Sequence, residues 1–124
     1  MQRDLELIRH IFLTTEALSN PEEPVIHTLA VEGFAQPVVN EHVKILIDSG
    51  YLEGEYKYAT NNRIFLTLVR SLTPRGFDFL DNIRHERVWS ALKNRVQQTT
   101  ETAAIGIVEE LAAQMVQAML GRPQ

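Results

Sequence analysis

The alternation of apolar and polar residues is clearest between Pro37 and Glu55, where it predicts a helix, a turn and the start of a strand. The apolar residues of this helix recur at spacings of four, three and one and share one face: Val39, Val43, Leu46 and Ile47. Gly50 then supplies the left-handed conformation that commonly ends a helix. A helix that ends at a turn and leads into a hairpin is typical of the second helix and wing of winged-helix proteins.

An antiparallel hairpin is predicted after this turn, with strands at residues 53–58 and 64–72. Asn61 and Asn62 in the connection tolerate the positive φ that a tight turn requires. Strict alternation along the second strand predicts one face on the core and one partly exposed face. The expected core set is Ile64, Leu66, Leu68 and Leu72. The expected exposed set is Phe65, Thr67, Val69 and Ser71.

Helices are predicted on both sides of this region. Residues 3–18 carry one broad apolar face, which predicts a core helix: Leu5, Ile8, Ile11, Phe12 and Leu18. Thr73 and Pro74 start another helix, because the hydroxyl can cap backbone donors and proline fits the first turn. Its apolar stripe continues to about Gln98 with a break near His85. A last helix, capped by Thr100 or Thr102, is expected to run to about Leu120.

The segment Val25–Val31 fits either a strand or a short helix. Its β-branched residues favour a strand, which is the preferred interpretation, whereas its length also suits a helix. A complete helix-turn-helix needs a helix here, followed by a turn at Gly33. A strand would truncate that motif and leave the next helix less well placed for a DNA groove.

These elements predict an α+β, mainly helical fold. A winged-helix-like domain with a β-hairpin wing is expected over residues 1–98, including the helix after the wing. Residues 99–124 form a C-terminal helical extension within one compact domain overall. This last helix is apolar over more than half its circumference, which exceeds what one contact face needs. A homodimer is therefore expected through a stripe at four-three spacing, with burial in a monomer as the alternative: Ala104, Val108, Leu111, Met115 and Ala118.

Length and composition are those of one soluble domain. With 124 residues, of which 44% are hydrophobic, the chain can bury about two thirds of its unfolded surface. Cysteine is absent, which excludes disulfides, thiolate metal sites and cysteine nucleophiles. No apolar run approaches the roughly 18 residues of a membrane span, and the N-terminus lacks the apolar core of a signal peptide. We therefore expect a cytoplasmic protein that does not enter a membrane.

The distribution of charge points to the middle of the chain. A net charge of −4 argues against coating nucleic acid through bulk charge. Residues 37–100 nevertheless carry nine basic and seven acidic side chains, and no acid lies between Tyr56 and Phe77. The helix from Pro37 is expected to present Asn40 and Lys44 outward, beside Glu41 and Asp48. The candidate contacts to double-stranded DNA are Asn40, Lys44, Lys57, Arg63, Arg70 and Arg75.

No catalytic, metal or cofactor site is expected. The four histidines are scattered singly, without the i, i+3 or i, i+4 pairs that build a metal site on one helix. Each is expected to be an ordinary surface or core-edge residue. The six glycines are isolated and form no phosphate-binding loop, and no nucleophile, base and orienting group can be assembled.

Three blocks of sequence carry a family resemblance that spans nearly the whole chain. They are MQRDLELIR at residues 1–9, HVKIL to GYL at residues 42–52, and LTPRGFDFLDNIR at residues 72–84, which Val88 and Trp89 follow. Together they resemble a bacterial and phage-borne family of small proteins designated as a domain of unknown function. The resemblance implies a winged-helix-like fold without an established activity.

Two classes of function therefore remain open. One is a dimeric DNA-binding transcriptional regulator of bacterial or phage origin, with the helix from Pro37 near the major groove and the wing on the backbone. The other is a protein-interaction module of the same fold that does not bind DNA and uses its acidic surfaces or its last helix.

Overall fold

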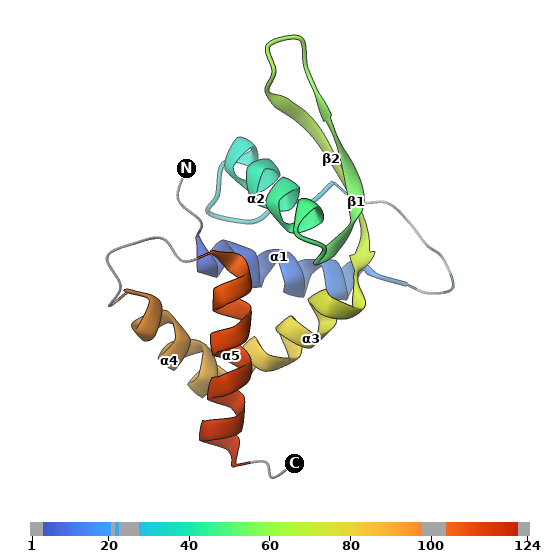
Figure 1. Ribbon diagram of the computed structural model, residues 1–124. Helices are drawn as coiled ribbons and strands as arrows, with labels where there is room; N and C mark the ends of the chain where they lie inside the picture. Colours follow the sequence, from blue (N-terminus) through green and yellow to red (C-terminus); the bar gives the residue numbers. More distant parts are fainter. Residues whose placement is uncertain (1–3, 21, 23–27, 98–103, 122–124) are drawn as a thin grey trace. The chain divides into compact units, whose positions relative to one another are not determined.

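The computed structural model describes residues 4–20, 22, 28–97 and 104–121. Within them the fold is α+β and mainly helical, with a two-stranded antiparallel sheet, as predicted (Figure 1). The elements in chain order are α1 (Leu5–Leu18), α2 (Gln36–Asp48), β1 (Leu52–Tyr58), β2 (Ile64–Leu72), α3 (Pro74–Ile83), α4 (Glu86–Gln97) and α5 (Ile105–Leu120).

The chain divides into two compact units, one formed by residues 4–77 and the other from residue 78 onward. In the first unit, α2 packs on both strands of the hairpin, and α1 packs on β2 and on α2. In the second unit, α4 packs on α5. The division falls inside α3 and not at residue 98, because α4 has its packing partner in α5. The single compact domain expected from the sequence remains a prediction.

Helix α1 supplies much of the buried apolar surface of the first unit. Asp4 caps it, because the Asp4 Oδ1 atom accepts a hydrogen bond of 3.2 Å from the Leu7 amide. The buried face consists of Leu7, Ile8, Ile11, Phe12 and Thr15. Leu18 is 42% exposed, so its prediction as a core residue was wrong. Thr15 lies on the buried face instead, where its hydroxyl donates to the Ile11 carbonyl at 2.8 Å.

A buried histidine ties α2 to the start of α1. The Asp4 amide donates to His42 Nε2 at 2.9 Å, and His42 Nδ1 lies 2.8 Å from the Val38 carbonyl oxygen. An amide can only donate, so Nε2 is the acceptor and Nδ1 carries the proton that the carbonyl accepts. His42 is 1% exposed and lies in the core, so the expected surface or core-edge position was wrong for this histidine.

The hairpin departs from strict alternation at two bulges. Its register pairs Leu52 with Leu72 and Tyr58 with Ile64, with shifts between Glu53 and Gly54 and between Lys57 and Tyr58. Each shift adds one residue to β2, so the buried positions follow spacings of three, two and three: Ile64, Thr67, Val69 and Leu72. The expected core face was therefore wrong in the middle of the strand. Leu66 and Leu68 are half-buried, and Thr67 and Val69 take the core positions.

The turn between α2 and β1 has the geometry that the sequence predicts. Gly50 adopts φ +86°, and its amide donates to the Ile47 carbonyl at 3.1 Å. The Tyr51 amide donates to the Leu46 carbonyl at 2.9 Å, which completes a Schellman motif. Tyr51 is fully buried, and its ring contacts Phe12 of α1 at a centroid distance of 6.2 Å.

The start of α3 closes around this same turn. The Thr73 amide donates to the Tyr51 carbonyl at 3.0 Å, and the Thr73 hydroxyl donates to the Gly50 carbonyl at 2.6 Å. The hydroxyl also accepts the Gly76 amide at 3.0 Å, which confirms Thr73 as the predicted helix cap. A Cβ atom on Gly76 would collide with the Tyr51 carbonyl oxygen. The contacts of Thr73 and Gly76 thus hold the start of α3 against the turn after α2.

The segment before α2 forms neither a strand nor a helix at Thr28–Val31. The expected strand is therefore wrong for these residues, while Val25–His27 lie outside the described part of the chain. This segment is held by hydrogen bonds from side chains and not by backbone pairing with a strand. The Thr28 hydroxyl donates to the Thr67 carbonyl at 3.1 Å, and Gln36 Nε2 donates to the Leu29 carbonyl at 2.8 Å.

The second unit consists of the end of α3 with α4 and α5. The break expected near His85 is confirmed, because α3 ends at Ile83 and α4 begins at Glu86. Buried residues of α4 and α5 are Val88, Trp89, Leu92, Ile105, Val108 and Ala112. Helix α5 ends at Leu120, as predicted, and Gly121 follows it in the left-handed conformation. The predicted threonine caps of α5 lie outside the described residues, and Ala104 holds the N-cap position without a side-chain hydrogen bond.

Gly76→Ala should destabilise the protein by about 1–3 kcal/mol, because the new methyl group meets the Tyr51 carbonyl. Helix propensity alone predicts the opposite sign, a gain of up to about 1 kcal/mol. Urea unfolding followed by circular dichroism measures the difference. Asn94→Ala, at an exposed position of α4, is the control and should stay within about 0.5 kcal/mol of wild type. A Gly76→Ala variant as stable as wild type would contradict the inference that this close approach requires glycine at residue 76.

Candidate functional site

The six candidate DNA contacts lie in different environments, and Asn40 is buried. It is 5% exposed, and its Oδ1 atom accepts hydrogen bonds from Gln36 Nε2 at 2.8 Å and Thr67 Oγ1 at 3.2 Å. The expected outward position of Asn40 on α2 was therefore wrong. The bulges in β2 turn Thr67 inward, and Asn40 satisfies its buried hydroxyl. Asn40 joins α2 to the hairpin and cannot reach a base.

Lys44 belongs to a polar cluster that fastens the end of α2 to β1. Its Nζ atom lies 3.1 Å from Asp48 Oδ2 and 5.6 Å from the centroid of the Tyr56 ring. The Tyr56 hydroxyl donates to Asp48 Oδ1 at 2.7 Å. This hydrogen bond lowers the pKa of Asp48 and raises the pKa of Tyr56, and the bond to Asp48 raises the pKa of Lys44. The charge of Lys44 is thus already matched within the helix.

Arg75 also has a structural role. Its Nη1 atom donates to the Ser49 carbonyl at 3.1 Å, and its guanidinium lies 4.6 Å from the centroid of the Tyr51 ring. Both contacts are with the turn after α2. Although Arg75 is exposed, these interactions hold its side chain against the base of the hairpin.

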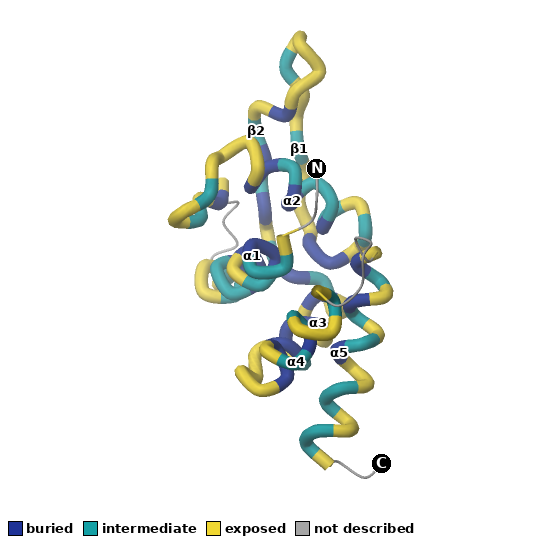
Figure 2. Tube along the Cα trace, turned by 90° about the vertical axis from the view of Figure 1, so that its left-hand side faces the viewer, coloured by how far each residue is buried: buried dark blue, intermediate teal, exposed yellow. Residues whose placement is uncertain are grey.

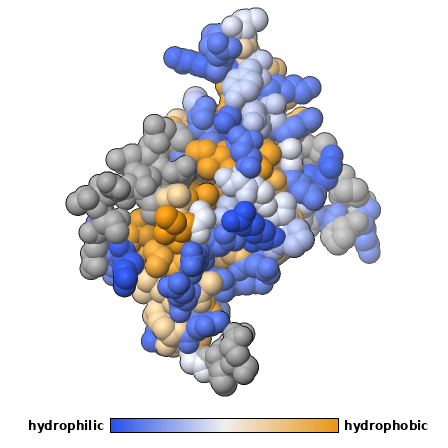
Figure 3. All heavy atoms as spheres, viewed as in Figure 1, coloured by the Kyte–Doolittle hydropathy of each residue, from blue (hydrophilic) through white to orange (hydrophobic). Residues whose placement is uncertain are grey.

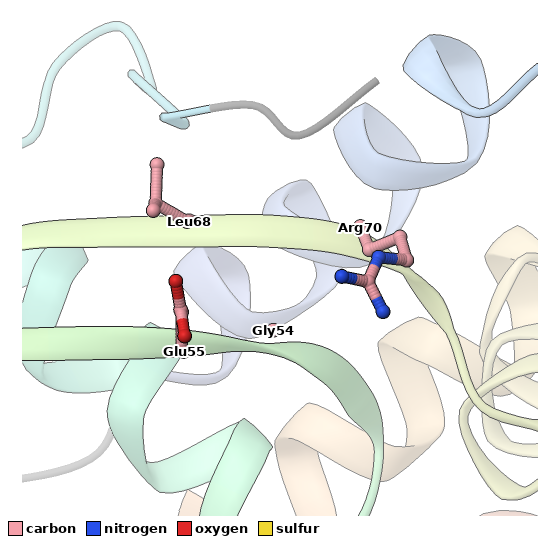
Figure 4. Close-up of a pocket in the computed structure, with 4 residues that line it drawn as sticks. All are labelled: Gly54, Glu55, Leu68 and Arg70. Carbon is pink, nitrogen blue, oxygen red and sulfur yellow. The ribbon is translucent and has the colours of Figure 1, made fainter. Parts of the chain in front are cut away.

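Arg70 lies on the hairpin beside a carboxylate. It lines a shallow hollow of about 210 Å³ with Gly54, Glu55 and Leu68. Figure 4 shows the Arg70 guanidinium and the Glu55 carboxylate on either side of Gly54. No ion pair joins these two side chains among the described residues, so Arg70 keeps an exposed charge, but it lies towards the base of the hairpin and away from its free end.

Lys57 and Arg63 are the candidates that lie farthest from the base of the hairpin. Both are exposed, and neither side chain has a hydrogen bond or ion pair with any described residue. They lie near the free end of the hairpin, residues 57–65, which extends past α2 (Figures 1 and 2). This end contains no carboxylate. Figure 3 shows that the projecting end is mostly hydrophilic on the side in view.

Two aromatic side chains accompany these cations. Tyr58 is 51% exposed and Phe65 is 60% exposed, which makes them the most exposed large apolar residues of the hairpin. Tyr58 packs edge-on against Tyr56 at a centroid distance of 5.8 Å. The sequence placed Phe65 on the exposed face but gave it no functional role, because its exposure becomes distinctive only when the following residues turn inward.

The proposed dimerisation stripe on α5 is not a single exposed face. Val108 is only 1% exposed and is unavailable to a second copy. Ala104 and Ala118 are exposed, Leu111 and Met115 are half-buried, and Ile107 beside them is 54% exposed. Figure 3 shows apolar residues along α5. The apolar surface that remains lies to one side of the expected stripe.

Neither a metal-binding cluster nor a membrane-spanning helix occurs among the described residues. There, no group of three or more histidine, aspartate or glutamate side chains is arranged to hold a metal ion. Of the helices that the structure describes, none has the length and apolar character to cross a membrane.

Comparison with known proteins identifies the family. The model of a family described as "Hypothetical protein (DUF2513)" matches residues 2–102. The chain belongs to this family. An uncharacterised protein of Haemophilus influenzae is 29% identical over 120 residues, which cover 97% of this chain and 99% of that protein. No solved structure matches. Apart from Met1, the three sequence blocks that carried the resemblance lie within the matched residues, and the family's description names no activity.

Tyr56→Phe should lower stability at neutral pH, because Asp48 loses the hydrogen bond that lowers its pKa. A lowered carboxylate pKa stabilises the fold fully above the ordinary value of about 4, and the effect is lost as pH falls below that value and through the lowered pKa. The raised pKa of Tyr56 stabilises below about 10 and is lost as pH rises above it. The difference between wild type and variant should therefore be largest near neutral pH.

Urea midpoints at pH 3, 7 and 10.5 measure this difference. Tyr58→Phe is the matched control, because the Tyr58 hydroxyl has no hydrogen-bond partner among the described residues. A difference for Tyr56→Phe that stays constant across the three pH values would show that the hydroxyl contributes without the charge of Asp48.

Proposed function

We propose that this protein is a DNA-binding module of winged-helix-like fold that contacts the sugar–phosphate backbone with its hairpin. One observation carries the proposal: Lys57 and Arg63 lie at the free end of the hairpin without a partner in the described structure. Exposed cations on a projecting wing suit phosphate oxygens, which make no demand on sequence. A role as a bacterial transcriptional regulator rests on this binding.

The order α1, α2, β1, β2 supports the winged-helix-like assignment, because a helix leads through a turn into the wing. The segment Thr28–Val31, which precedes α2, is not helical, so the described helices do not form a complete helix-turn-helix. In addition, Asn40 is buried and Lys44 is paired with Asp48. We therefore assign the contact with DNA to the hairpin and assign no base recognition to α2.

A protein-interaction module is the second candidate, and the outward side of α2 favours it. Val38 is 36% exposed there, Ile45 is half-buried, and Glu41 adds a negative charge. Such a mixture of apolar and acidic residues suits a protein surface better than a phosphate backbone. If the protein does not bind DNA, interaction with another protein is the candidate function that remains.

Salt-dependent binding to a mixed-sequence duplex tests the first proposal. The double variant Lys57→Ala/Arg63→Ala should bind more weakly than wild type at low salt. If each cation neutralises one phosphate, the slope of log K against log salt should fall in magnitude by about 1.8. Fluorescence anisotropy between low and physiological salt measures both quantities.

Arg95→Ala is the control for this experiment, because Arg95 is an exposed cation on α4 and its removal changes the net charge by the same sign. It should leave the slope unchanged. Undetectable wild-type binding at low salt, or a double variant that behaves like wild type, would refute hairpin binding and favour the protein-interaction module.

We also propose that α5 mediates a homodimer through Ala104, Leu111, Met115 and Ala118, with Ile107 replacing the buried Val108. Leu111→Glu should dissociate the dimer, because a carboxylate would enter an apolar contact. Light scattering after size exclusion reports the mass, which for one chain is 14.1 kDa. Ala113→Glu lies on an exposed part of α5 away from this set and should remain dimeric. A monomeric wild type would refute the proposal.

A further inference from the structure

Phe65 is an exposed aromatic residue at an irregular position of the hairpin. Its neighbours Ile64 and Leu66 pair with Tyr58 and Lys57, so Phe65 is the extra residue of the bulge. Bulges commonly redirect a side chain and are frequent beside functional sites. Phe65 is 60% exposed, although moving a phenylalanine ring out of water is energetically favourable. No described ring or cation contacts it.

The surroundings of Phe65 are positive. Arg63 lies two residues before it, and Lys57 pairs with Leu66 directly after it. No acidic residue occurs from Tyr56 to Phe77. An aromatic face flanked by two unpaired cations suits a ligand that combines an aromatic ring with negative charge. A nucleotide has this combination, because its base can stack while its phosphates attract the cations.

We infer that Phe65 stacks on an unpaired base, so that the hairpin prefers nucleic acid with exposed bases to a perfect duplex. This inference rests on the proposed function, because Lys57 and Arg63 supply the phosphate contacts in both. In a perfect duplex the faces of the bases are stacked on one another, and a side chain must first separate them. Unpaired bases present their faces without that cost.

The geometry also argues for nucleic acid over an apolar protein groove. A hydrophobic anchor for a protein usually sits at the centre of an apolar patch. Around Phe65, Arg63 and Lys57 are charged, residues 60–62 are polar, and the other exposed aromatic residue, Tyr58, carries a hydroxyl. Charge complementarity therefore selects a polyanion as the occupant of this end of the hairpin.

Three DNA ligands of equal length test the inference: a perfect duplex, the same duplex with a central unpaired bubble, and one of its single strands. Fluorescence anisotropy should show tighter binding to the bubble and the single strand than to the perfect duplex. Phe65→Ala should weaken binding to the unpaired ligands by roughly 5- to 150-fold and leave duplex binding unchanged. Circular dichroism should confirm that the variant is folded.

Two further variants separate stacking from general hydrophobic contact. Phe65→Leu keeps an apolar side chain without an aromatic face and should lose as much affinity as Phe65→Ala. Phe65→Tyr keeps the ring and should retain wild-type affinity. Phe77→Ala removes an exposed phenylalanine from α3 and should change nothing.

The outcomes distinguish the two proposals. Equal affinity for the perfect duplex and the bubble, or unchanged bubble binding in Phe65→Ala, would overturn base stacking. Loss of duplex binding in Lys57→Ala/Arg63→Ala would then still support the backbone contacts. Retention of affinity by Phe65→Leu would also overturn stacking, because the contact would not need a ring. Absence of binding to all three ligands at low salt would overturn both proposals and leave a protein partner.

Discussion

The first unit depends on the turn at Ser49–Tyr51, where the backbone carbonyls of three successive residues accept hydrogen bonds from the start of α3. Arg75 donates to the Ser49 carbonyl, while Thr73 donates to Gly50 through its hydroxyl and to Tyr51 through its amide. The carbonyls of a turn that follows a helix have no partner within that helix, so a remote segment that supplies donors satisfies them and fixes the turn. Since Thr73 directly follows β2, the same contacts close the base of the hairpin. Gly76 permits the approach, because any Cβ there would meet the Tyr51 carbonyl. One local arrangement thus determines how α2, β1, β2 and the beginning of α3 meet.

The base and the free end of the hairpin consequently differ in character. Towards the base, side chains bridge α2 and the strands: Asn40 bonds to Thr67, and Asp48 bonds to Tyr56. Beyond these contacts the strands continue past α2, and Lys57, Arg63 and Phe65 have no such bridges in the described structure. A binding group is most effective when its support is rigid and its own side chains are available. At the free end of the hairpin the side chains of Lys57, Arg63 and Phe65 are available, whereas Asn40 and Asp48 of α2 are bonded to the strands.

The sequence predicted the elements well and their faces less well. Helix limits, the Gly50 turn, the Thr73 cap and the break near His85 follow from local rules, since each depends on residues within one turn of the chain. The faces of β2 depend on pairing with β1, and two bulges reverse the inward set between Ile64 and Leu72 in a way that alternation along one strand cannot reveal. The wrong outward prediction for Asn40 has the same origin, because the buried Asn40 side chain bonds to a Thr67 hydroxyl that was expected to be exposed. Three of the six candidate contacts, Lys57, Arg63 and Arg70, retain the exposure and the unpaired charge that phosphate binding requires, and the first two lie at the free end of the hairpin.

The net charge of −4 does not decide whether the hairpin attracts a polyanion, because electrostatic interactions between exposed charges are screened beyond about 8–10 Å at physiological salt. The local charge of the projecting end matters more, and it is positive. Two cations nevertheless give only a weak interaction, since each phosphate contact contributes modestly and is lost as salt rises. A site with so few charges needs another source of affinity. Base stacking by Phe65 would add a contribution that salt does not screen, and a dimer would bring two hairpins to one nucleic acid and raise their effective concentration. Affinity that persists at physiological salt therefore requires at least one of these two features in addition to Lys57 and Arg63.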